Sequence, residues 1–203
     1  MSLTAFRAPQ SLISLPLAEP WALDDTPREL FTRGVAPLFC TAGAQTLTYA
    51  ASHPLQRQAL LDELAQEDLV LTHPSLLTRP LHELWDGSAL IGMLATQGQV
   101  LETNDALHLT LHFEMAFVRE PWRRQGLAKE MVRAAAGEAL ALVEGRMQWL
   151  SLSGRSIEIT LGTNDASPAG QALFDIAEEM IALAEDDAMV AGVDFTLLNT
   201  RGI

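Results

Sequence analysis

Residues 108–129 have the sequence HLTLHFEMAFVREPWRRQGLAK, and this stretch decides the fold class of the chain. In its first half, the odd positions from Leu109 to Phe117 are all apolar. Such alternation is typical of a strand that packs one face on a core. The even positions include the titratable residues His112 and Glu114. We therefore expect one strand whose odd residues share a single buried face and whose other face is polar.

A turn rich in positive charge links this strand to a helix. Pro121 stops sheet pairing because it has no N–H group, and the Ala-rich segment Leu127–Glu144 has helical apolar spacing. The window 119–133 has a net charge of +3, in a chain of formal charge −13. One interpretation of these charges is a solvated helix face. The other is a cradle for phosphate or pyrophosphate, formed by Gly126, the basic side chains and the unpartnered N–H groups of the helix start.

The surrounding elements give a mixed α/β pattern. An Asp-Gly pair at 86–87 between two apolar runs predicts a hairpin. Thr-Pro at 26–27 and Ser-Pro at 167–168 are each typical of a helix N-cap followed by the first helical residue. Further elements are expected as helices at 54–68 and 168–185 and as strands at 45–50, 81–85, 89–95, 156–161 and 192–198.

Composition excludes several function classes. The 203 residues suit one domain, and the charge of −13 argues against nucleic acid or an anionic membrane as partner, because both need a positive footprint. The single cysteine, Cys40, excludes an intramolecular disulfide, and the five histidines lack metal-ligand spacing, so no metal is expected. Without a targeting segment or a long apolar run, a cytoplasmic protein is expected.

The segment RRQGLA at 123–128 resembles the Arg/Gln-x-x-Gly-x-Gly/Ala motif of the GNAT superfamily of acyl-CoA-dependent N-acyltransferases. In that family the motif follows a strand ending in Val, then Pro, then an aromatic residue, as in VREPW at 118–122. The resemblance covers about 81–175. It is architectural over 1–80 and poor from 176 onward.

The resemblance implies a single GNAT-like domain over 1–203. Its mixed, mostly antiparallel twisted sheet would be flanked by helices, and one strand pair would splay. Residues 1–80 would form a variable N-terminal region, 81–175 the cofactor-binding core and 176–203 a divergent C-terminal part. Acetyl-CoA would be the co-substrate, with its pantetheine arm beside the central strand and its pyrophosphate at the helix start. The implied cofactor-binding residues are Ala116, Phe117, Val118, Arg123, Arg124, Gln125, Gly126, Leu127, Ala128 and Lys129.

The implied reaction is direct transfer of an acetyl group to a primary amine in a ternary complex. Family members that use a strand carboxylate as base have it eleven residues before the motif, where this chain has His112. An unperturbed histidine titrates near pH ~6.5 and suits a base as it stands. Glu114 would either need its pKa raised by burial or act through a water. The alternative is that both are polar residues on a wet strand face.

The usual general acid of the family is a Tyr on the helix after the next strand. The matching run at 167–174, SPAGQALF, ends in Phe174, which cannot donate a proton. Either a water or Ser167 would then protonate the leaving thiolate, or no acid would be needed.

Three functions stay open: an N-acetyltransferase whose acidic chain favours a cationic amine, a GNAT-fold protein that binds acyl-CoA without turnover, and an anion site outside the family. The acceptor and the oligomeric state, with a homodimer as one option, are also open.

Overall fold

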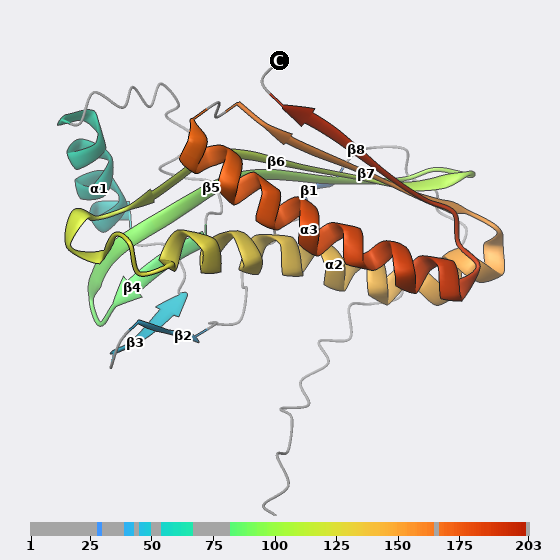
Figure 1. The fold of residues 1–203 in the computed structure, drawn as a ribbon, viewed down its shortest axis with the longest axis horizontal. Coiled ribbons are helices and arrows are strands. Elements are labelled where there is room, and N and C mark those ends of the chain that lie inside the picture. The colour runs from blue at the N-terminus through green and yellow to red at the C-terminus, as the bar shows by residue number, and fades with distance from the viewer. Residues whose placement is uncertain are drawn as a thin grey trace, which may run out of the picture.

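The computed structural model describes residues 28–29, 39–42, 45–49, 54–66, 82–164 and 167–201 (Figure 1). Its elements in chain order are β1 (Arg28–Glu29), β2 (Phe39–Ala42), β3 (Gln45–Tyr49), α1 (Pro54–Gln66), β4 (His82–Asp86), β5 (Ala89–Glu102), β6 (Ala106–Val118), the 3-10 helix η2 (Glu120–Trp122), α2 (Leu127–Ser153), β7 (Ser156–Thr163), α3 (Pro168–Ala191) and β8 (Phe195–Arg201).

One sheet joins all of the strands, in the order β2-β3-β4-β5-β6-β7-β8, with β1 paired to β5. Neighbours from β2 to β6 are antiparallel, whereas β6, β7 and β8 are parallel. The two parallel crossovers place α2 and α3 side by side on one face of the sheet (Figure 1). The predicted fold class, a mixed and mostly antiparallel sheet flanked by helices, is therefore confirmed.

The helix predicted to begin near Pro27 is wrong. Arg28 and Glu29 form β1 instead and pair with Val100 and Gln99 of β5. The cap signal at 26–27 is local, and an available edge of the long strand β5 outweighs it, because every pairing added to that edge satisfies backbone hydrogen-bonding groups.

The first core lies between the sheet and the two long helices. Leu109 and Leu111 of β6 and Ile159 of β7 are almost completely buried there, against Met131 of α2 and Ile181 of α3. Burial of a side chain of this size contributes about 1.5–3 kcal/mol. The apolar stripe predicted for α2 is thus confirmed, and it packs α2 onto the sheet.

Both long helices extend beyond their predicted ends and stop at glycine. In α2 the buried stripe continues through Val143 to Leu150, and Gly154 ends the helix with a φ of 65°. In α3 the corresponding residue is Gly192, with a φ of 70°. A left-handed residue after the last turn favours glycine because a side chain there is strained.

Strand β6 changes faces at Glu114. In the register with β5, Thr96 pairs with Phe113 and Ala95 with Met115, so Glu114 is an additional residue, a β-bulge. Odd residues up to Phe113 therefore face α2, whereas Phe117 enters a second core on the other side. The prediction that all odd positions share one face is wrong beyond Phe113.

The second core lies under α1 on the opposite face of the sheet. Its buried members are Leu60, Leu64, Trp85, Leu90, Met93 and Phe117. Within the described ranges, two ion pairs join α1 to the sheet. Arg57 Nε and Glu83 Oε1 of β4 lie 2.7 Å apart with both side chains fully buried. The guanidinium of Arg119, just after β6, contacts both carboxylate oxygens of Glu63, at 2.9 and 2.6 Å.

Candidate acyl-CoA site

Strand β6 extends past the end of its partner β7. The pairs between them run from Ala106 with Ser156 to Phe113 with Thr163, where β7 ends. On its other side, β6 stays paired to β5 as far as Val118. The pairing of these two parallel strands therefore ends at Phe113, in the region where the family resemblance implies a splayed strand pair.

The backbone of Ala116 and Val118 faces the side that β7 has left. The N–H of Arg119 donates to the carbonyl of Ile91 in β5 at 2.8 Å. In an antiparallel pair, alternate residues direct both backbone groups to the same partner strand. Phe117 and Arg119 thus face β5, and Ala116 and Val118 face away from it. An extended ligand laid along this edge would find backbone donors and acceptors at strand spacing.

The turn between β6 and α2 contains two residues in the left-handed region. Arg124 has a φ of 63° and Gly126, the N-cap of α2, has a φ of 80°. Successive left-handed and right-handed residues direct backbone N–H groups into one concavity that binds anions. Gly126 supplies no side-chain cap, and a Cβ built on it would meet nothing within 4 Å among the described residues. The first N–H groups of α2 have no intrahelical partner, and no side chain caps them.

The basic residues of the window 119–133 do not all serve this turn. Arg119 and Arg133 each pair with a carboxylate, of Glu63 and Glu130. Arg124 and Lys129 are exposed, and within the described part of the chain neither forms an ion pair. These two are the cations available to a phosphate group at the start of α2.

Arg123 and Phe117 are turned away from the helix start. Arg123 Nε donates to the carbonyl of Val118 at 2.7 Å, and its guanidinium lies 5.3 Å from the centre of the Phe117 ring. The Phe117 ring itself is buried under α1. Leu127 is buried as well, whereas Gln125 is exposed and donates to the carbonyl of Pro121 at 3.3 Å. The predicted cofactor-binding side chains are therefore divided. Those exposed at the turn are Arg123, Arg124, Gln125 and Lys129, and those buried are Phe117, Val118 and Leu127.

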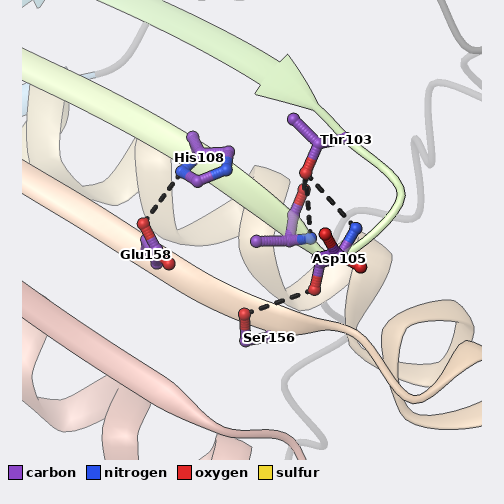
Figure 2. Close-up of polar contacts among 6 residues, drawn as sticks. Thr103, Asp105, His108, Ser156 and Glu158 are labelled. Atoms are coloured by element: carbon purple, nitrogen blue, oxygen red, sulfur yellow. Dashed lines mark hydrogen bonds and ion pairs between the residues drawn. The ribbon is translucent and has the colours of Figure 1, made fainter.

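The candidate bases lie where the strands part. His112 is half-buried and pairs across the sheet with Gln97 of β5 and Gly162 of β7. Glu114, also half-buried, is the bulge residue itself. A third titratable residue of β6, His108, lies at the far end of the strand, with its Nδ1 3.0 Å from Glu158 Oε2 (Figure 2).

In this chain Phe174 stands where the resembling family has its tyrosine, and its side chain lies in the first core. Phe174 of α3 is buried, with its ring edge-on to Phe113 at 6.5 Å between centroids and an interplanar angle of 81°. It provides packing at the point where β6 and β7 separate. Ser167 caps α3 by accepting from the N–H of Gly170 at 3.0 Å.

Sequence reasoning missed the surroundings of His112 and of Arg119. A Cβ on Gly162 would lie only 2.5 Å from His112 Nδ1. A glycine inside a strand signals such a close approach, and it was the one available hint. Nothing local links Arg119 to Glu63, which is 56 residues away.

Among the described residues, no group of three or more His, Cys, Asp and Glu side chains could hold a metal ion. No helix in the described ranges is long and apolar enough to cross a membrane.

No protein-family model matches the chain, and no curated protein matches it in sequence. Two crystal structures of an aminoglycoside acetyltransferase from an uncultured soil metagenomic sample are similar to it. The one in complex with sisomicin is 16% identical with a TM-score of 0.34, and the one in complex with trehalose is 14% identical with a TM-score of 0.33. In both cases the similarity covers 62% of this chain and 77% of the other chain.

A third similar structure is the aminoglycoside N-acetyltransferase AAC(6')-Iy in complex with CoA. It is 14% identical with a TM-score of 0.29, and the similarity covers 71% of this chain and 83% of the other.

Proposed function

We propose that the chain is an acyl-CoA-dependent N-acetyltransferase, which moves an acetyl group from acetyl-CoA to a primary amine in a ternary complex. One observation carries the proposal: β6 continues past the end of β7 and leads directly to the uncapped start of α2. That arrangement offers an extended arm a strand edge and offers a pyrophosphate a helix N-terminus, in the order in which coenzyme A presents them.

The proposed cofactor contacts follow from this order. The backbone of Ala116 and Val118 would bind the pantetheine arm, with Arg123 releasing the Val118 carbonyl that it now contacts. The N–H groups from Arg124 to Lys129 would bind the pyrophosphate. The exposed Arg124 and Lys129 side chains would supply full charges beside the partial charge of the helix dipole.

The proposed chemistry is one substitution at the thioester carbonyl. The amine nitrogen forms the new C–N bond as the C–S bond breaks. The proton lost by the amine goes to His112, directly or through one water, with Glu114 as the second candidate base. The thiolate takes a proton from water, because the ring of Phe174 has none to give. The acidic remainder of the chain favours a cationic amine as acceptor.

The experiment that tests this function measures free thiol while the protein is incubated with acetyl-CoA and a panel of polyamines, amino sugars and lysine peptides. We expect thiol release with at least one amine, and a loss of on the order of a hundredfold in kcat for His112→Ala. His108→Ala is the matched control, because His108 lies on the same strand but pairs with Glu158.

The buried Phe174 favours one alternative, a protein that binds acyl-CoA without turnover. Thermal stabilisation by coenzyme A, with no thiol release on any amine, would establish that alternative. Absence of both stabilisation and thiol release would contradict the acyl-CoA site as a whole.

A substitution at Gly126 tests the cofactor cradle separately from the chemistry. Gly126→Asp places a carboxylate where the pyrophosphate would lie, so we expect coenzyme A affinity in calorimetric titration to fall roughly tenfold further than in Gly126→Ala. The alanine variant is the control, since it also places a side chain at a φ of 80° but carries no charge. Equal affinities of the two variants would contradict an anion site at this turn.

A further inference from the structure

We propose that Gly162 of β7 is a positioning residue for His112: the missing side chain at 162 is what lets the imidazole lie across β7 at the point where the strands part. The catalytic meaning of this inference rests on the proposed function. The geometry on which it stands is independent of that function.

Space, and not backbone conformation, is the reason for glycine at position 162. His112, Gly162 and Thr200 follow one another across β6, β7 and β8. A Cβ on Gly162 would lie 2.5 Å from His112 Nδ1, 2.9 Å from Thr200 Oγ1 and 3.3 Å from His112 Cε1. Gly162 is not among the glycines with positive φ. Any other residue there would have to displace the imidazole.

The same contacts place the ring. Nδ1 is the imidazole atom nearest to the position that a Cβ on Gly162 would take. Thr200 Oγ1 lies close to the same position and donates its proton to the carbonyl of Leu161 at 3.1 Å. The imidazole and the Thr200 hydroxyl therefore border the space that a side chain at 162 would need.

The position of the His112 imidazole beside Gly162 matters because of where it lies along β6. His112 directly precedes Phe113, the last residue of β6 that pairs with β7. A fixed ring at this point would hold its basic nitrogen beside the gap into which the thioester is proposed to extend. Displacement of a catalytic group by about 1 Å costs on the order of a hundredfold in rate.

The first test examines the imidazole without any substrate. Long-range ¹H–¹⁵N spectra of the full chain, with the His112 signals assigned by His112→Gln, report the surroundings of the imidazole nitrogens. We expect displaced His112 signals in Gly162→Ala. Gly145→Ala is the control, because a Cβ at Gly145 in α2 meets nothing within 4 Å. Unchanged His112 signals in Gly162→Ala would overturn the proposal.

The second test uses the amine acceptor identified by thiol release. We expect Gly162→Ala to lower kcat by roughly ten- to a hundredfold with little change in the KM for acetyl-CoA. In the His112→Ala background the same substitution should have almost no effect, since its effect passes through the imidazole. Equal losses in both backgrounds would mean a merely structural role for Gly162. A chain without turnover fails the proposed function, but the spectra still decide whether Gly162 positions His112.

Discussion

At the scale of single residues, two described groups with shifted pKa values lie away from the candidate site, between β4 and α2. His82 Nδ1 and Glu138 Oε1 are 4.0 Å apart, and that oxygen is buried without a hydrogen-bond partner in the described part of the chain. Burial lowers the pKa of His82 from 6.5 to about 4 and raises the pKa of Glu138 from 4.5 to about 7. Each group therefore favours its neutral form in the folded protein.

The free energy of unfolding should depend on pH through Glu138. Between pH 4.5 and about 7 the folded protein holds a proton that the unfolded chain releases, so this group's contribution falls as the pH rises. Gln carries no charge at any pH. We expect Glu138→Gln to raise the melting temperature at pH 8 and to change it little at pH 5.

Thermal melts from pH 5 to pH 8 provide the measurement. Glu144→Gln is the matched control, because Glu144 lies on the same helix and is exposed. If Glu138→Gln raised the melting temperature equally at pH 5 and pH 8, the raised pKa of Glu138 would be contradicted. His82 contributes in the opposite direction, with stability lost as the pH falls from 6.5 through about 4.

At the scale of the element, β6 supplies both cores, and the bulge at Glu114 determines which side chain enters which core. Leu111 and Phe113 face α2 before the bulge, whereas Phe117 faces α1 after it. Deletion of Glu114 would return β6 to strict alternation. Because a shift of one residue moves every side chain to the other face, Phe117 and Val118 would exchange sides.

We therefore expect deletion of Glu114 to lower the free energy of unfolding by at least roughly 3 kcal/mol, comparable to the loss of a large buried side chain. Glu114→Ala keeps the residue count and should cost no more than about 1 kcal/mol. Urea denaturation of the two variants measures the difference. Equal midpoints would show that the bulge does not set the register.

At the scale of the whole molecule, the two cores differ greatly in size, and so should their local stabilities. Among the described residues, the second core has six buried members, and α1 contacts the sheet through them and through the ion pairs of Arg57 and Arg119. A unit with few buried contacts opens at a lower free energy than the global unfolding. We expect the amides of 57–65 to exchange before those of 107–113.

Hydrogen exchange followed by mass spectrometry measures this order on the intact chain. Arg119→Gln should accelerate exchange in α1 and leave the β6–β7 ladder unchanged, since it removes only the tie to Glu63. Exchange of α1 at the rate of the ladder would mean that both cores open as one unit.

The sequence predicts most of this molecule because its signals are local. The hairpin at 86–87, the Ser167 cap and the alternation up to Phe113 each depend on neighbours in the chain. The bulge escaped prediction because Met115 and Phe117 are apolar and suit either face. The motif at 123–128 and the strand before it predicted the helix start and the strand edge of the candidate site. The contact between His112 and Gly162 was not predictable, because it exists only once β6 and β7 pair.

The parallel arrangement of α2 and α3 gives an acidic protein a polarity. Both helices begin near the C-terminal ends of β6 and β7, with Gly126 and Ser167 as their N-caps, and both run toward the opposite ends of these strands (Figure 1). Their macrodipoles add, with about half a positive charge at each start. The chain has a net charge of −13, yet at this end of the two helices the potential is locally more positive than at the other. An anionic group of a ligand is therefore favoured beside the open strand edge, although the rest of the molecule repels it.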